Sequence, residues 1–97
     1  MTTIVCGIVN ADGSIQSGTG FTTVHENTGL YQIIFNQSFP SAPAVTATQD
    51  WNNVYPGGGD TRDGAVPVYV TPATTEIKTG NNGGTPADRC FSFMAAL

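Results

Sequence analysis

The residues able to do chemistry in this chain gather in loops rather than in a compact motif. The segment 51–64 (WNNVYPGGGDTRDG) holds the only tryptophan, with a tyrosine, two asparagines, an arginine and two aspartates. An aromatic face can stack on the apolar side of a pyranose, while amide and guanidinium groups bond its hydroxyls. The segment therefore predicts a sugar-recognition site. The candidate ligand-binding residues are Trp51, Asn52, Asn53, Tyr55, Arg62, Asp63 and Arg89. Alternatively, Trp51 fills the core and the loop is merely long.

A second long loop, residues 80–88 (GNNGGTPAD), is rich in glycine and asparagine. Long loops in compact domains are usually functional or disordered. Loops cluster at the ends of β-sandwiches, so Asn81, Asn82, Asp88 and Arg89 are expected to line the same end as Trp51.

The titratable residues give little sign of catalysis. His25, the only histidine, would need a nucleophile and an orienting carboxylate to act as a base. Its neighbour Glu26 points to the opposite face of a strand, which favours a surface histidine beside a turn. Seven acids on a small open domain offer no enclosed cleft for a pair of catalytic carboxylates. The sequence therefore predicts a non-enzyme.

The segment 60–64 (DTRDG) carries two carboxylates able to bind Ca²⁺. Its spacing differs from that of an EF-hand loop, and Arg62 lies between the two acids. This pattern favours a turn with an internal Asp–Arg pair, and we expect no metal and no cofactor.

The elements that must position these loops have the pattern of strands. Short apolar, β-branched and aromatic segments alternate with glycine, proline and asparagine turns, which is typical of an antiparallel all-β domain. No segment has the 3.6-residue apolar stripe of a helix. We expect one domain, residues 1–97, folded as a small antiparallel β-sandwich of jelly-roll type. The expected strands are 3–10, 14–17, 21–25, 30–36, 44–50, 66–71, 74–79 and 89–96.

Inward-facing residues are predicted from the alternation within two strands. Tyr31, Ile33 and Phe35 share one face of the segment 30–36, and Phe91 and Phe93 share one face of the last strand. We expect these aromatic and aliphatic side chains to form the core.

Charge and hydropathy exclude several classes of partner. The net charge is −4, and the three cationic residues Arg62, Lys78 and Arg89 are scattered, which argues against nucleic acid. No apolar run approaches the roughly 18 residues that span a bilayer, so membrane insertion is not expected. The N-terminal segment MTTIVCGIV lacks the basic region and cleavage site of a signal peptide, so export is expected to use another route or a signal outside this sequence.

Self-association is expected because a chain of 97 residues builds only a modest core. Charged residues make up 10% of the chain, against about 25% in a typical domain. Apolar residues at 33–34 and 68–70 fall on both faces of their strands, which favours a subunit interface there; packing beneath loops is the alternative.

Cys6 and Cys90 lie near opposite ends of the chain, and either a disulfide or two buried free thiols fits that placement.

Two linked patterns resemble a known group of proteins. They are G-I-V-x-x-D-G-S-I-x-S-G-x-G-F from Gly7, and G-x-Y-x-I-x-F-x-x-x-F-x-x-x-P-x-V from Gly29 to Val45. Together they resemble the β-sandwich tip domains of phage tail fibres and bacterial surface fibres. The segment from Tyr31 also resembles the H-type lectins and, more distantly, the C1q and tumour-necrosis-factor jelly rolls. The insertion at Gly57–Gly59 departs from the lectin pattern, so no binding residue is transferred.

The resemblance implies trimerisation around a threefold axis and receptor binding through apical loops. We therefore expect a homotrimeric, receptor-binding tip domain of a fibre or adhesin, outside the cell or on a virion, that recognises a cell-surface glycan. The alternatives are a structural trimerisation cap of a fibre and a free-standing small lectin.

Overall fold

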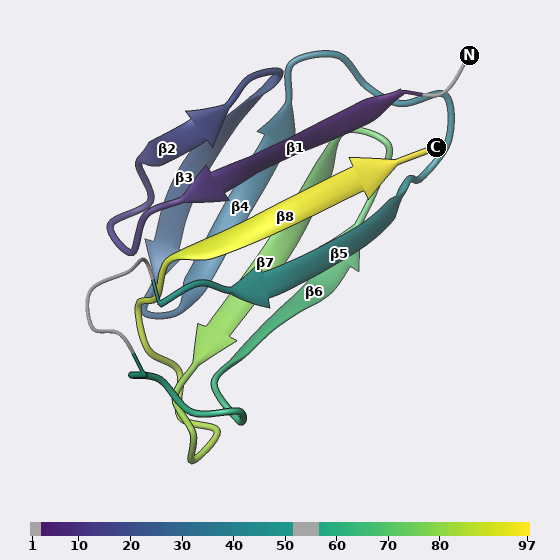
Figure 1. Cartoon of the computed structure of the whole chain (residues 1–97). Coiled ribbons are helices and arrows are strands. Elements are labelled where there is room, and N and C mark those ends of the chain that lie inside the picture. The colour runs from purple at the N-terminus through teal and green to yellow at the C-terminus, as the bar shows by residue number, and fades with distance from the viewer. Residues whose placement is uncertain (1–2, 52–56) are drawn as a thin grey trace.

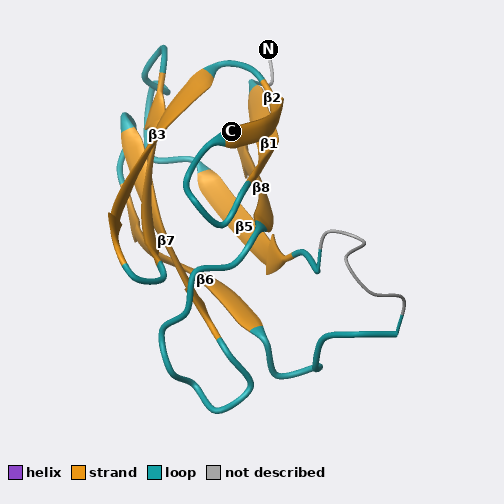
Figure 2. Cartoon of the chain, turned by 90° about the vertical axis from the view of Figure 1, so that its left-hand side faces the viewer, coloured by secondary structure: helices purple, strands orange, loops and turns teal. Residues whose placement is uncertain are grey.

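The computed structural model describes residues 3–51 and 57–97, which form eight strands and, within those ranges, no helix that could cross a membrane. Two four-stranded antiparallel sheets, ordered β2-β1-β8-β5 and β3-β4-β7-β6, face each other as a sandwich (Figures 1 and 2). The expected all-β sandwich is confirmed. The strands are β1 (Ile4–Val9), β2 (Ile15–Gly18), β3 (Phe21–Asn27), β4 (Leu30–Phe35), β5 (Ala44–Gln49), β6 (Gly64–Val70), β7 (Thr74–Gly80) and β8 (Phe91–Ala96).

The core lies between the sheets and follows the alternation of the sequence. In β4, Tyr31, Ile33 and Phe35 point inward and are buried, as predicted. From the other sheet, Phe91 and Phe93 of β8 meet them, also as predicted. A dense apolar layer of this kind supplies most of the free energy that holds a sandwich together.

The first strand passes unusually close to the core aromatics, which explains one glycine. A Cβ built on Gly7 would lie 2.5 Å from the Phe21 ring and 2.5 Å from the Ser17 carbonyl oxygen. The Phe21 ring in turn packs edge-on against Phe93, with centroids 4.8 Å apart. Gly7 therefore lets an aromatic from one sheet pack beneath the backbone of the other.

The chain termini and the long loops occupy opposite ends of the sandwich (Figure 1). Thr3 and Leu97 exchange two backbone hydrogen bonds, of 3.3 and 3.1 Å, so the two ends of the chain lie side by side. The loops that carry Trp51 and Arg89 lie at the other end.

The cysteines do not pair. Both Cys6 and Cys90 are free thiols, and Cys6 is exposed while Cys90 is buried. Cys6 lies in β1 opposite Met94 of β8, with its side chain on the outer face. Cys90 immediately precedes β8 at the loop end, so the two thiols are directed to different parts of the molecule. The disulfide considered above is not formed, and the interpretation of two buried thiols is correct only for Cys90.

Candidate ligand-binding site

Strand pairing brings Trp51 and Arg89 together at the loop end. β5 and β8 are hydrogen-bonded neighbours with Gln49 opposite Phe91, and the Asp50 N–H continues the ladder to the Cys90 carbonyl at 2.9 Å. Trp51 follows directly and is 40% exposed. The Arg89 guanidinium carbon lies 5.4 Å from the centre of the Trp51 ring, a cation–π distance.

The Arg89 side chain is held from two further directions. Its guanidinium donates to Gln49 Oε1 at 2.9 Å and lies 3.6 Å from the Asp63 carboxylate, which is itself mostly buried. Gln49 uses its amide group to donate to the carbonyls of Gly64 and Gly80, at 3.0 and 2.8 Å. This network ties both long loops to the end of β5 and fixes the cation against the indole, so little ordering remains to be done on binding.

Hollows lie on more than one side of Trp51. One of about 470 Å³ is bordered by the first turn, the end of β5 and the residues before β8: Asn10, Asp12, Asp50, Trp51, Asp88 and Arg89 are among its lining. Another, of about 320 Å³, lies between Trp51 and the backbone of Gly58 and Gly59. Both hollows are open to solvent, and Trp51 lines each of them.

Asp88, which lines the larger hollow, is held by two contacts. Its carboxylate accepts a hydrogen bond from the Gly29 N–H at 2.7 Å and lies 2.8 Å from His25 Nε2. The Gly29 hydrogen bond is the main reason why the pKa of Asp88 is lowered from its ordinary value, and the His25 contact adds to it. Asp88 thereby fastens the second long loop to the turn between β3 and β4.

His25 has a more defined role than a surface histidine beside a turn. Its ring stacks on Tyr31, with centroids 4.6 Å apart, and its side chain is about one quarter exposed. The Tyr31 hydroxyl donates to the Ala11 carbonyl at 2.6 Å, and burial raises the pKa of Tyr31 to about 12. The carboxylate that orients His25 is Asp88, 63 residues away, rather than the adjacent Glu26.

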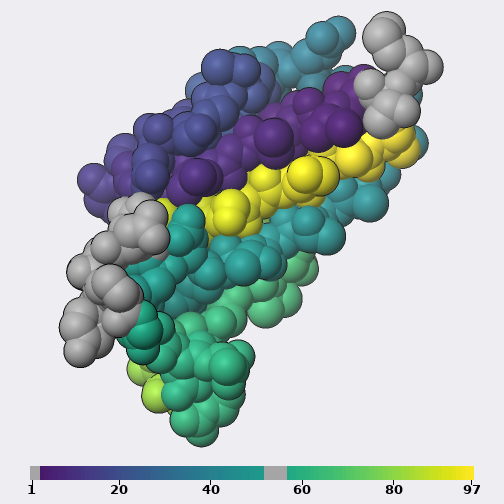
Figure 3. Space-filling view, in the orientation of Figure 1, coloured from purple at the N-terminus to yellow at the C-terminus, as the bar shows by residue number. Residues whose placement is uncertain are grey.

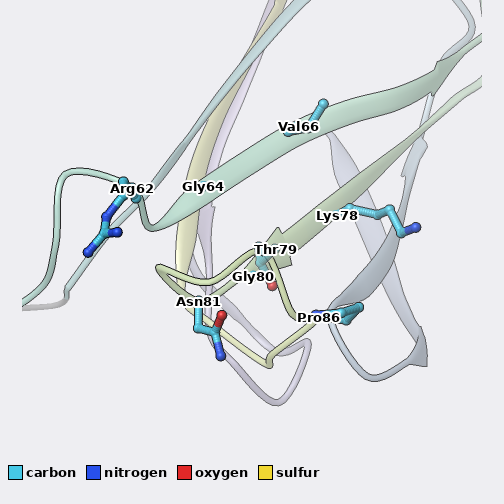
Figure 4. Close-up of a pocket in the computed structure, with 9 residues that line it drawn as sticks. Arg62, Gly64, Val66, Lys78, Thr79, Gly80, Asn81 and Pro86 are labelled. Atoms are coloured by element: carbon cyan, nitrogen blue, oxygen red, sulfur yellow. The ribbon is translucent and has the colours of Figure 1, made fainter.

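Arg62 lies apart from the Trp51 hollows. Its guanidinium forms two hydrogen bonds with the Asp60 carboxylate, of 3.0 and 3.2 Å, which confirms the expected Asp–Arg turn. The pair lowers the pKa of Asp60 and raises that of Arg62. Arg62 lines a different hollow of about 220 Å³, in which its side chain and that of Lys78 point away from each other (Figure 4).

The other predicted residues divide into three groups. Asp63 belongs to the site, although it acts by holding Arg89 rather than by facing solvent. Asn82 joins Trp51 and Arg89 in lining a hollow of about 240 Å³. Asn52, Asn53 and Tyr55 lie outside the described residues. Among the residues that are described, no group of three or more His, Cys, Asp or Glu side chains is arranged to hold a metal ion.

Several contributors to the site were missed from the sequence. Asn10 and Asp12 line the larger hollow from the first turn, far from Trp51 in the chain. Gln49 had a readable signal, because it continues the inward-facing series of Val45 and Ala47 in β5. A polar side chain at an inward position must find hydrogen-bond partners, and those partners are the two long loops.

Comparison of the chain with protein-family models, with curated proteins and with solved structures finds no match in any of the three. The site is therefore defined by its own geometry: an exposed tryptophan, braced by a fixed arginine, between shallow hollows at the loop end of a β-sandwich.

Proposed function

We propose that this protein is a non-catalytic binding domain that recognises a carbohydrate on a cell surface, displayed on a fibre, a virion or a cell. The observation that carries the proposal is the position of Trp51. Its large ring stays 40% exposed although Arg89 and the surrounding network hold it in place. Leaving a large apolar side chain in water forgoes a favourable burial of about 1.5–3 kcal/mol, so a fixed, exposed indole favours a stacking ligand.

The hollow beside Trp51 supplies the polar half of sugar recognition. Asn10, Asp12 and Asp50 are among its lining residues, and the Asn10 amide and the Asp12 carboxylate also hydrogen-bond Ser14 in the first turn. Carboxylate and amide groups bond pairs of sugar hydroxyls, while the indole covers the apolar face of the ring. A carbohydrate ring matches this combination of one aromatic wall and a polar rim.

The excess of acidic residues at the loop end favours some classes of sugar over others according to the charge that the sugar carries. Among the described residues, the larger hollow is lined by Asp12, Asp50 and Asp88 and by one arginine, Arg89, which already lies beside Asp63. A carboxylated or sulfated sugar would bring negative charge to a region of negative charge. The ligand we propose is therefore a neutral or amino-bearing sugar.

The proposal includes assembly as a homotrimer, because a single shallow site binds weakly. Presenting several sites on one particle multiplies the affinity for a surface that carries many copies of the ligand. A structural trimerisation cap remains the competing proposal, and it predicts no sugar binding at all.

A glycan array tests the proposal with three forms of the protein. The parent is expected to bind neutral or amino-bearing glycans, and Trp51→Ala is expected to lose that signal. Tyr69→Ala is the matched control, because Tyr69 is an exposed aromatic, 57% accessible, on the outer face of β6; its variant should bind like the parent. A parent that binds nothing, or a folded Trp51→Ala variant that binds equally well, overturns the proposal. Far-UV circular dichroism establishes that each variant is folded.

A further inference from the structure

We propose that the site around Trp51 accommodates two linked sugar rings, and that Gly59 is the residue that keeps room for the second ring. The inference rests on the sugar-binding function proposed above and narrows its ligand to an oligosaccharide of at least two rings. Trp51 lines both the hollow of about 470 Å³ and the hollow of about 320 Å³. Among the described residues it is the only one that the two linings share, so both hollows border this one side chain.

Each of the two hollows is large enough for a small ligand. Small-molecule sites in proteins usually have volumes of about 300–1,000 Å³, and both hollows fall within that range. The larger hollow takes the first ring, beside Asn10 and the acids of its lining. The smaller hollow, between Trp51 and the backbone of Gly58 and Gly59, is free for a second ring. Two linked rings can therefore contact the indole from both hollows at once.

Gly59 leaves the surface of the indole uncovered in the smaller hollow. A Cβ built on Gly59 would lie 3.6 Å from Cδ2, 3.6 Å from Cε3 and 3.7 Å from Cγ of Trp51. Cδ2 is bonded to both other atoms, and a carbon in the ring plane beside the edge would lie nearer to Cγ or Cε3 than to Cδ2. The added carbon would therefore lie over the face of the ring. It would rest there at ordinary van der Waals distance and cover the surface on which a sugar ring stacks.

The charged groups around the smaller hollow are already paired. Arg62 donates two hydrogen bonds to the Asp60 carboxylate, and the Arg89 guanidinium lies 3.6 Å from the Asp63 carboxylate. Thr61, which also lines this hollow, is exposed, and its hydroxyl can donate to a sugar hydroxyl or accept from one. An uncharged ring therefore finds hydrogen-bonding groups here without leaving an ion unpaired.

Both hollows can be reached by a long glycan. They are open to solvent, and the segment 57–63 lies on the surface at the loop end, beyond the ends of β5 and β8 (Figure 3). The ends of a bound oligosaccharide therefore need not be enclosed by the protein. This suits a ligand that is part of a longer chain on a cell surface.

Gly59→Ala and Gly57→Ala form a matched pair of variants. The backbone φ is 80° at Gly59 and 79° at Gly57, so alanine strains the chain to the same degree at both positions. A Cβ on Gly57 meets no described atom within 4 Å, whereas one on Gly59 meets the indole. A difference between the two variants therefore reports the covering of the ring rather than backbone strain.

Isothermal titration calorimetry compares galactose with lactose, and N-acetylglucosamine with N,N′-diacetylchitobiose. The parent and Gly57→Ala are expected to bind the preferred disaccharide at least about tenfold more tightly than its monosaccharide, because the covalent link holds the second ring at a high effective concentration. In Gly59→Ala the affinity for the disaccharide should fall to that for the monosaccharide, which itself stays as in the parent. A parent that gains nothing from the second ring, or equal losses in the two folded variants, overturns the inference and leaves the sugar site intact.

Fluorescence tests the role of Gly59 without any sugar. Trp51 is the only tryptophan, so its emission reports this site alone. Acrylamide is expected to quench that emission less in Gly59→Ala than in Gly57→Ala, because the methyl group covers part of the ring. Equal quenching in the two folded variants contradicts the assignment of Gly59.

An NMR titration of the ¹⁵N-labelled parent needs no variant. The disaccharide is expected to shift the backbone N–H signals of Gly58 and Gly59 together with the Trp51 indole N–H, and the monosaccharide to shift mainly the indole. Shifts at Trp51 with both sugars, but none at Gly58 and Gly59, would contradict the second subsite while supporting the sugar site. No shift at Trp51 with any of the four sugars would overturn both proposals.

Discussion

At the scale of single residues, the site depends on how a few polar groups hold one indole. Arg89 contacts Trp51 on one side, and Gln49 and Asp63 hold Arg89 from the others. A guanidinium that stacks on a ring is not equivalent to an ammonium, because only the planar group can lie along the ring and donate in two directions.

Arg89→Lys is therefore expected to weaken sugar binding while keeping the positive charge beside Asp63. If loss of the guanidinium's stacking geometry loosens the indole by as much as a cation–π contact is worth, about 0.5–2 kcal/mol, the affinity falls by about two-fold to thirty-fold. Arg62→Lys is the matched control, since Arg62 pairs with Asp60 beside a different hollow. Isothermal titration calorimetry checks both, and equal losses in the two variants would contradict the assignment.

The lowered pKa of Asp88 predicts how the stability of the protein changes at acid pH. Its folded-state pKa lies below the unfolded value of about 3.9, so its contribution to stability is present above that pH and is lost as the pH falls through the folded pKa. Asp88→Asn keeps an acceptor for the Gly29 N–H but cannot ionise. Its melting temperature should lie below the parent's at pH 7 and change less between pH 5 and pH 2. Parallel curves for the two proteins would rule out this role.

At the scale of elements, the fold follows from the alternation of inward and outward residues along each strand, and the site follows from the pairing of strands that are distant in the sequence. β4 was predictable because Tyr31, Ile33 and Phe35 share one face and turn residues bound the segment. Some strands begin at a different residue from the one that the sequence pattern predicts. Strand β6 begins at Gly64, two residues before the predicted start, because Gly64 pairs with Gly80 of β7. The last strand begins at Phe91 rather than at Arg89.

The composition of the site was only partly predictable, because the contact that creates it is non-local. Trp51 was singled out by its rarity, but its neighbour Arg89 arrives through the pairing of Gln49 with Phe91, 42 residues away. Arg62 lies closer to Trp51 in sequence and was expected beside it, yet its two hydrogen bonds to Asp60 keep it in a turn. Of the two arginines expected at the site, Arg89 therefore lies against the indole, and Arg62, although closer in the chain, does not.

Truncating the buried face of β4 should cost far more than truncating its outer face. Phe35→Ala removes a buried ring that packs edge-on against Phe39 at 4.9 Å, and such truncations cost about 3–5 kcal/mol. Ile34→Ala, at the adjacent half-buried position on the opposite face, is the control and should cost distinctly less. Urea unfolding measures both, and equal losses would mean that the facing of β4 is wrong.

The outer face of the sheet β3-β4-β7-β6 carries two acids, Glu26 and Glu76, whose interaction changes the stability of the protein with pH in a defined direction. The Glu76 hydrogen bond raises the pKa of Glu26 above its value in the unfolded chain. The stability that protonated Glu26 contributes is therefore present below the unfolded pKa and is lost as the pH rises through the folded pKa. Glu26→Gln should therefore melt higher than the parent at pH 7, with the difference shrinking at pH 4. Thermal melts at the two pH values check this, and a difference that does not depend on pH would contradict it.

At the scale of the whole molecule, the residues of the candidate site and most of the acids gather at one end of the sandwich. The loop end gathers Trp51 and Arg89 with five of the seven acids: Asp12, Asp50, Asp60, Asp63 and Asp88. The β2-β1-β8-β5 face is free of charge and flanks the long axis of the sandwich. If several copies are displayed on one particle as proposed, with their loop ends exposed, each copy contributes a sugar site to multivalent binding.

The most direct test of the sugar site is an NMR titration of the ¹⁵N-labelled protein with a neutral hexose and an N-acetylhexosamine. Binding at the loop end predicts that the Trp51 indole N–H and the Arg89 backbone N–H shift together, in fast exchange at millimolar sugar. Signals from the hollow around Lys78 and Asn81 should stay in place. Saturable shifts confined to that second hollow, or no shift at Trp51 with either sugar, would contradict the account.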